Sequence, residues 1–314
     1  MSSPALPVTR ACELDEEPAE QRWLLEGLWA RSAIGLIGGA PKCCKTWLGL
    51  DMAVSVASGT PALGTFACQA PGSALVYLAE DGLPQVRARI EGLCLQRGRD
   101  IGSLDLQVIT APLLRLDLAA DQERLARTIE ALRPRVLLLD PLVRLHRLDE
   151  NSAAEISGLL GYIRGLQRRF DLAVILVHHA SKKQRSQPGQ ALRGSSDLHA
   201  IGDSNAYLAR DGKQIVLTIE HRAARSPEPV RLELATDPGG EAAHLRVVSS
   251  GGVASDRPKL EQLVLECFSP TKEPLTRAAL RVALRVNNQR LGDALERLER
   301  SGRIERTPQG WVLQ

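Results

Sequence analysis

The stretch Gly39-Ala40-Pro41-Lys42-Cys43-Cys44-Lys45-Thr46 joins an apolar segment to a helical pattern and is the most specific sign of the fold. It matches the Walker A pattern G-x-x-x-x-G-K-[S/T] at every defined position except the second glycine. Backbone N–H groups of such a loop bind phosphate oxygens, the lysine reaches the β- and γ-phosphates, and the hydroxyl holds Mg²⁺. Lys45 and Thr46 are predicted to take these last two roles toward ATP and Mg²⁺. The predicted nucleotide contacts are Gly39, Ala40, Pro41, Lys42, Cys43, Cys44, Lys45, Thr46 and Trp47.

Cys44 stands where the motif has its second glycine. A side chain there crowds a place where backbone approaches phosphate, and a positive φ would cost a non-glycine residue about 1 kcal/mol or more. Nucleotide binding is compatible with this change, whereas the rate of hydrolysis depends on how far the loop is distorted. The alternative is a chance Lys-Thr pair at the start of a helix. It is disfavoured because strand, turn and helix follow in the required order.

Short apolar segments alternate with helical patterns around this loop. The predicted strands cover 33–37, 74–79, 106–110, 135–139 and 172–177, and the predicted helices cover 45–58, 84–97, 122–132 and a stretch capped by Ser152 and Glu155. This βαβ alternation predicts an α/β fold with a twisted, mostly parallel sheet. Later segments at 205–208, 214–220 and 230–234 predict antiparallel strands.

Composition divides the chain into four predicted parts. Residues 1–19 are rich in proline and acidic residues, which predicts a disordered tail. Residues 20–248 form the α/β ATPase domain, and residues 249–257, rich in glycine and serine, form a linker. Residues 258–314 form a small C-terminal domain.

Acidic residues end two of the predicted strands. Asp140 closes an apolar strand in the form of a Walker B element, which orients Mg²⁺ through water. Glu80 follows the strand at 74–79, at the edge where parallel-sheet sites are built, and is predicted to act as the general base that polarises the attacking water. The alternative for Glu80 and Asp81 is a solvated pair at a helix N-terminus, with Asp81 as the cap.

His178 and His179 end another predicted strand at the same edge. Successive residues on a strand point to opposite faces, so only one of the two is expected to reach the γ-phosphate. We predict that His179 senses the γ-phosphate, with a buried structural role as the alternative for the other histidine. The predicted catalytic residues are therefore Glu80, Lys45, Asp140 and His179, with Thr46 and Asp140 as the metal-binding pair.

The overall composition, with 44% hydrophobic and 25% charged residues, is that of a soluble globular protein. Ten aromatic residues in 314 disfavour a surface built on base stacking. The six cysteines show no CxxC spacing, and neither a signal peptide nor an apolar run of membrane-spanning length is found, so a cytoplasmic location is expected. The net charge is +3, and residues 257–314 alone carry eleven basic against seven acidic residues, which gives +4.

The C-terminal part predicts three short helices, the last over 288–301, followed by a hairpin over 304–313. This arrangement resembles the winged helix-turn-helix, whose third helix commonly enters the major groove of DNA while the wing touches the backbone. Many such modules instead bind proteins, which is the alternative here. The predicted phosphate contacts, whose binding should weaken steeply with salt, are Arg281, Arg285, Arg290 and Arg306.

The region from Trp23 to Val248 resembles the RecA-like hexameric ATPases typified by plasmid replicative helicases of the RepA type. The resemblance is carried by the loop at 38–48 and by further motifs at 23–28, 77–81, 140–142, 148–151, 177–179 and 193–196. It implies a RecA-type twisted sheet, a ring of six subunits, ATP between neighbours and single-stranded DNA in a central channel. It also implies the same roles for Lys45, Thr46, Glu80, Asp140 and His179.

The resemblance also implies a DNA-contacting loop and an arginine that acts on a neighbouring subunit. The basic segment with Lys182, Lys183 and Arg185 stands where the family places DNA contacts, although basic loops are usually only solvated. The positions 203–205 read Asp-Ser-Asn where relatives tend to show the arginine acting in trans. Arg193 and Arg210 are the candidates for that role.

Two functions agree with these predictions. The first is an ATP-hydrolysing DNA motor or helicase in the replication of a plasmid or other mobile element, with DNA and further copies of the chain as partners. The second is an ATP-gated DNA-binding regulator that hydrolyses ATP slowly or not at all, because Cys44 distorts the loop.

Overall fold

The computed structural model describes residues 6, 8–14, 22–179, 196–212, 214–236, 243–248, 260–268, 274–284, 291–292, 294–295, 298–299, 302–307 and 310–313. The chain divides into two compact units, Met1–Val248 and Ser249–Gln314. Within the predicted N-terminal tail, a short 3-10 helix, η1, spans Ala11–Glu13. Among the helices that the structure describes, none is long and apolar enough to cross a membrane.

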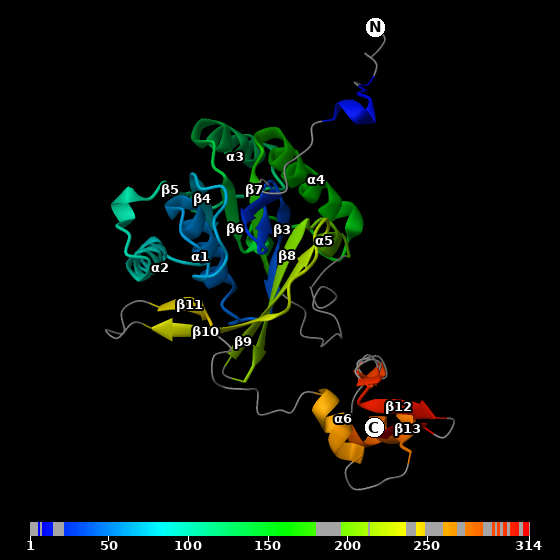
Figure 1. The fold of residues 1–314 in the computed structure, drawn as a ribbon. Helices are drawn as coiled ribbons and strands as arrows, with labels where there is room; N and C mark the ends of the chain where they lie inside the picture. The colour runs from blue at the N-terminus through cyan, green and yellow to red at the C-terminus, as the bar shows by residue number, and fades with distance from the viewer. Residues whose placement is uncertain are drawn as a thin grey trace. The chain divides into compact units, whose positions relative to one another are not determined.

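The described part of the first unit is built on a nine-stranded sheet in the order β11-β10-β9-β8-β3-β7-β6-β4-β5 (Figure 1). The six strands from β5 to β8 in this order run parallel. Their bounds are β3 Ile34–Gly39, β4 Ala74–Leu78, β5 Leu106–Val108, β6 Val136–Asp140, β7 Ala173–His179 and β8 Ser204–Asp211. The predicted α/β class with a mostly parallel sheet is confirmed.

Helices cover both faces of this sheet (Figure 1). Helices α1 (Lys45–Ser58) and α2 (Leu83–Gln96) pack on one face, and α3 (Ala119–Leu132) and α4 (Ala153–Phe170) pack on the other. Alternate residues of β6 serve the two layers, since Leu138 joins the core under α1 while Leu137 joins the core under α4. Burial on both faces explains why these strands read as unbroken apolar runs.

The ends of two helices differ in part from the predicted caps. Helix α4 begins as predicted, because the Ser152 side chain accepts a hydrogen bond from the Glu155 N–H, but the Glu155 carboxylate accepts from the Asp149 N–H instead of reaching back to Ser152. Helix α2 has Gly82 as its N-cap residue and no side-chain cap, so the alternative with Asp81 as the cap is wrong.

The remaining elements of the first unit are short and connect the main layers. A hairpin of β1 (Trp23–Leu25) and β2 (Trp29–Ala30) precedes β3, and its Trp29 is fully buried. The 3-10 helices η3 (Ile101–Ser103) and η4 (Leu142–Arg144) follow α2 and β6, and the short helix α5 (Ser196–Ala200) precedes β8.

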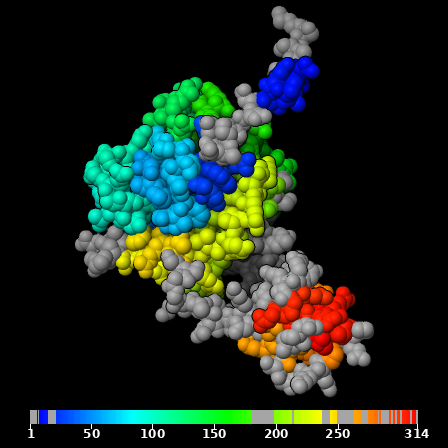
Figure 2. Space-filling model, viewed as in Figure 1, coloured from blue at the N-terminus to red at the C-terminus, as the bar shows by residue number. Residues whose placement is uncertain are grey.

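The antiparallel extension of the sheet consists of β9 (Gln214–His221), β10 (Val230–Thr236) and β11 (Ala243–Val247). Strands β9 and β10 were predicted, whereas β11 was not, although its residues Ala-His-Leu-Arg-Val alternate between apolar and polar side chains. Strand β11 packs against α1 and α2. Figure 2 shows this yellow segment directly against the blue and cyan surface of these helices.

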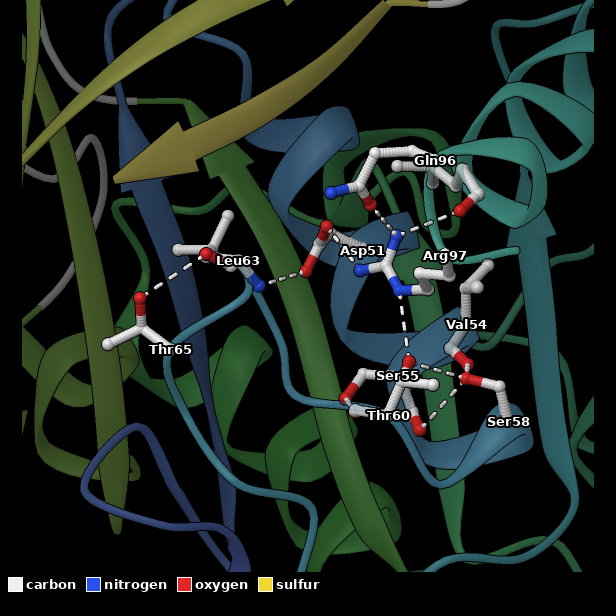
Figure 3. Close-up of polar contacts among 10 residues, drawn as sticks. Asp51, Val54, Ser55, Ser58, Thr60, Leu63, Thr65, Gln96 and Arg97 are labelled. Atoms are coloured by element: carbon white, nitrogen blue, oxygen red, sulfur yellow. Dashed lines mark hydrogen bonds and ion pairs between the residues drawn. The ribbon is translucent and has the colours of Figure 1, made fainter. Parts of the chain in front are cut away.

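A buried ion pair ties α1 to the end of α2 (Figure 3). Asp51 is 1% exposed, and Arg97 donates to its carboxylate over 2.6 Å. The second carboxylate oxygen accepts from the Leu63 N–H at 2.7 Å, and Arg97 also donates to the Thr60 hydroxyl at 3.1 Å. Burial raises the pKa of Asp51 although Arg97 and the Leu63 N–H act in the opposite direction. The network thus joins α1, the end of α2 and the 60–63 loop.

The second unit contains helices α6 (Leu260–Phe268) and α7 (Arg277–Leu284) and the hairpin of β12 (Ile304–Thr307) and β13 (Gly310–Leu313). The described residues between 291 and 299 are also helical. These elements share a small core formed by Val264, Phe268, Leu280, Leu291, Leu295, Leu298 and Ile304. A winged helix-turn-helix remains a prediction for this unit.

Candidate nucleotide-binding site

A cavity of about 280 Å³ lies at the carboxyl edge of the parallel strands. We call residues 39–46 the phosphate loop; it leaves β3 and enters α1. The strands β4, β6 and β7 end at the same edge and bring in side chains from separate parts of the sequence. The cavity is lined by 42–47, Leu78, Glu80, Asp81, Arg89, Asp140 and His179. All four predicted catalytic residues are therefore brought together.

The phosphate loop has two non-glycine residues in the left-handed region. Lys42 and Cys44 both have a φ of 63°, which costs an L-residue about 1–2 kcal/mol relative to glycine. Cys44 therefore has the positive φ that the sequence analysis identified as unfavourable for a non-glycine residue at this position. Gly39 is required for another reason, because a Cβ at this position would lie 2.5 Å from the carbonyl oxygen of Leu208 on β8.

Lys45 is buried at the start of α1 and is 5% exposed. Its Nζ donates to the carbonyl oxygens of Gly39 at 3.0 Å and Ala40 at 2.8 Å. Burial lowers the pKa of Lys45, while the nearby carboxyl groups of Asp140 and Glu80 act to raise it. Among the described residues, the hydrogen bonds of this ammonium group go to carbonyl oxygens beside a cavity, so it is well placed to exchange them for phosphate oxygens.

Asp140 and Thr46 form the part of the cavity that fits a metal ion. The Thr46 side chain acts to lower the pKa of the Asp140 carboxyl group, and the buried Oδ2 of Asp140 has no hydrogen-bond partner among the described residues. Burial raises the pKa of Asp140 to about 6, with smaller contributions from Asp81 and Glu80. A hydroxyl and a carboxylate are suitable oxygen ligands for Mg²⁺. In the described ranges, no group of three acidic, histidine or cysteine side chains could hold a metal ion.

This elevated pKa predicts a pH dependence for Mg²⁺·ATP binding. Asp140 must be ionised to attract Mg²⁺, so its contribution is full well above pH 6 and falls as the pH drops through 6. We expect the ratio of wild-type to Asp140→Asn affinity for Mg²⁺·ATP to fall about tenfold between pH 7 and pH 5. Calorimetric titration of both proteins measures this ratio and cancels the titration of ATP itself. A ratio that is constant with pH would contradict the assignment.

Glu80 does not stand free in the cavity. Its Oε1 accepts a hydrogen bond from Arg144 Nε at 2.8 Å, and both side chains are well exposed, at 47% and 63%. Arg144 belongs to η4, which follows β6, and was not predicted as a site residue. The sequence has no motif that marks it, because its proximity to Glu80 depends on how the turn after β6 lies beside the end of β4.

Arg89 of α2 also lines the cavity, although no sequence motif predicted it as a site residue. It forms an ion pair with Asp81, and its guanidinium lies 5.3 Å from the centre of the Trp47 ring. Trp47, the last of the predicted nucleotide contacts, is half-buried at the wall of the cavity. This cation–π contact connects the first turn of α1 to α2.

The two histidines at the end of β7 lie in different surroundings. His179 lines the cavity, and burial together with the charge of Lys45 lowers its pKa, which favours the neutral ring. His178 is 2% exposed, and its Nε2 lies 3.2 Å from the Glu150 carboxylate, which is also 3.7 Å from His146 Nε2. The γ-phosphate role of His179 stays a prediction.

The predicted basic residues fall partly outside the described ranges, which do not include Lys182, Lys183, Arg185, Arg193, Arg285 and Arg290. Arg281 and Arg306 are exposed on the second unit, and Arg306 lies 5.5 Å from the Trp311 ring. Arg210 is exposed on β8, but its guanidinium donates to the Lys42 carbonyl of its own phosphate loop. Asp203, in the Asp-Ser-Asn segment, pairs with Arg164 and Arg222 and accepts from the Ile34 N–H at the opposite end of β3.

Comparisons with known proteins agree with this architecture. A sequence profile of the family described as an AAA domain matches residues 2–185, more than half of the chain. A search with this chain finds no matching curated protein sequence. A solved DnaB-like replicative helicase, described with its interactions with primase, superposes with a TM-score of 0.51 at 17% identity, over 68% of this chain and 57% of the other. The RadB recombinase superposes with a TM-score of 0.51 at 15% identity, over 70% of this chain and 92% of the other. At these identities the likeness establishes a RecA-like fold.

Proposed function

Because the chain belongs to the AAA domain family, we propose that it binds and hydrolyses Mg²⁺·ATP and works as a DNA-associated motor. The observation that carries this proposal is the convergence of Lys45, Thr46, Glu80 and Asp140 on one cavity at the edge of a parallel sheet. These are the groups that phosphoryl transfer to water requires: a phosphate-binding lysine, two metal ligands and a carboxylate that orients water.

Each group has a separate task when ATP is bound. Lys45 would leave the Gly39 and Ala40 carbonyls for the phosphates, and Thr46 and Asp140 would hold Mg²⁺, which would neutralise charge on the phosphate oxygens. Glu80, released from Arg144, accepts a hydrogen bond from the attacking water and takes up its proton. His179, as a neutral ring, donates a hydrogen bond to the γ-phosphate and thereby distinguishes ATP from ADP.

DNA is the proposed partner. The solved neighbours are described as a replicative helicase and a recombinase, and the sequence motifs resemble hexameric helicases of the RepA type. We propose a hexameric ring like that of those helicases. In it, Lys182, Lys183 and Arg185 contact single-stranded DNA, and Arg193 acts on a neighbouring subunit. Residues 258–314 are proposed as a winged helix that binds duplex DNA through Arg281, Arg285, Arg290 and Arg306. A role in replication of a plasmid or mobile element belongs to the same proposal.

ATP hydrolysis with and without DNA tests this function directly. We expect hydrolysis by the wild-type chain to be stimulated at least about tenfold by single-stranded DNA, with stimulation that falls steeply as salt rises. Lys45→Ala should abolish both basal and stimulated turnover, because the phosphates lose their cation. Two results would contradict the proposal. One is a wild-type chain that binds no Mg²⁺·ATP, and the other is a Lys45→Ala variant that hydrolyses ATP as fast as wild type.

An ATP-gated DNA-binding regulator with little or no hydrolysis is the second candidate. The left-handed Cys44 favours it, because strain in the phosphate loop can slow turnover without preventing binding. If this is the cause of slow turnover, Cys44→Gly should raise the ATPase rate on DNA several-fold, while Cys44→Ala, which keeps a Cβ, should not. An unchanged rate in Cys44→Gly would show that loop strain does not limit hydrolysis.

A further inference from the structure

Arg210 reaches the phosphate loop of its own chain. It lies near the end of β8, and its Nε and Nη2 donate to the same oxygen, the Lys42 carbonyl, at 3.3 and 3.0 Å. Arg210 follows Leu208, whose backbone pairs with Gly39 at the start of the loop. The strand beside β3 therefore presents a cation to the middle of a loop that lies 168 residues earlier in the sequence.

The peptide that Arg210 binds lies between two strained residues. Lys42 and Cys44 both have a φ of 63°, a conformation that is unfavourable for residues with a Cβ and persists only where the surroundings hold it. The carbonyls on the other side of the loop, those of Gly39 and Ala40, are bound by Lys45. Once Lys45 turns to phosphate, Arg210 is the side chain that, within the described part of the chain, still binds a loop carbonyl.

The charge of Arg210 also acts on Cys44. Burial raises the pKa of the Cys44 thiol, and the charge of Arg210 has a smaller effect in the opposite direction. The guanidinium thus binds the carbonyl of one left-handed residue, and its charge acts on the side chain of the other. Glycine at position 44 would adopt this conformation without the Cβ penalty, so a loop with cysteine there has more need of an external support.

We propose that Arg210 is a positioning residue that acts in cis, holding the phosphate loop in its binding conformation where Cys44 replaces the motif's glycine. This role rests on the proposed function, since the conformation matters through nucleotide binding. It differs from an arginine that acts on a neighbouring subunit, because the group that Arg210 binds belongs to its own chain.

Nucleotide affinity in a double-mutant cycle tests the proposal. The proteins are wild type, Arg210→Gln, Cys44→Gly and the double variant, with fluorescent mant-ATP and Mg²⁺ as the probe. Arg210→Gln should weaken binding about five- to tenfold in wild type, because the competent loop becomes a minor population. With Cys44→Gly the same change should cost twofold or less. Arg246→Gln, which removes an exposed arginine paired with Glu233 on the neighbouring strand β10, is the matched control and should not alter the affinity.

Two outcomes would overturn the proposal. An equal loss in both backgrounds would mean that Arg210 contacts the nucleotide itself, and no loss in either would mean that it does not support the loop. Hydrogen–deuterium exchange of the nucleotide-free protein separates this result from a failure of the proposed function. Arg210→Gln should speed exchange of the peptide covering 39–50 about fivefold in wild type and twofold or less with Cys44→Gly, and equal effects would overturn the proposal even if no nucleotide binds.

Discussion

Replacement of Glu80 by glutamine is expected to lower the turnover number for ATP about 10²- to 10⁴-fold, which is the usual contribution of a positioned general base. Glutamine keeps the shape of the side chain and its contact with Arg144 Nε, but it cannot take a proton from water. Binding of ATP should change less than about threefold, because Lys45 and the loop are the groups proposed to hold the phosphates. Single-turnover hydrolysis and a mant-ATP titration measure the two quantities separately.

A matched control is available on α3. Glu130 pairs with Arg169 at 3.3 Å, with both side chains about half exposed, as for Glu80 and Arg144. Glu130→Gln should therefore leave turnover unchanged, since it removes a surface ion pair of small free energy away from the cavity. Turnover that survives Glu80→Gln, or falls equally in the control, would remove Glu80 from the role of base.

Replacement of Asp51 by asparagine is expected to lower the free energy of unfolding by about 3–5 kcal/mol. Arg97 would then be left as a buried cation, at 5% side-chain exposure, without its counter-charge. Burial already raises the pKa of Asp51, so the pair as a whole adds little net stability, and the large cost arises from breaking one side of it. Chemical denaturation followed by circular dichroism measures the change.

The partner variants make this explanation specific. In the double variant Asp51→Leu with Arg97→Met, both charges are gone, and we expect most of the lost stability to return. Glu91→Gln breaks the exposed ion pair with Arg87 on α2 and should change stability by less than about 0.5 kcal/mol. A double variant as unstable as Asp51→Asn would show that hydrogen bonds, not the unpaired charge, dominate the network.

The local sequence predicted most strands and helices of the first unit because their signals are contained within each segment. Buried parallel strands are continuous apolar runs, and α1 begins at the Lys45-Thr46 step of a phosphate-binding motif. Strand β11 was missed although its five residues alternate between apolar and polar, because its pairing with β10 and its packing against α1 and α2 cannot be seen within so short a segment. The alternative in which Asp81 caps α2 was wrong, since Gly82 is the N-cap residue and Asp81 pairs with Arg89.

The sequence by itself determined the α/β class and the residues that a phosphate site needs, since motif spacing and apolar periodicity are local properties of the chain. Only the tertiary structure decided which side chains these residues contact. Glu80 is hydrogen-bonded to Arg144, 64 residues away in the sequence, and the Lys42 carbonyl is hydrogen-bonded to Arg210, 168 residues away. Contacts of this kind arise from the order of strands in the sheet and from side-chain reach. No pattern within a single segment encodes them.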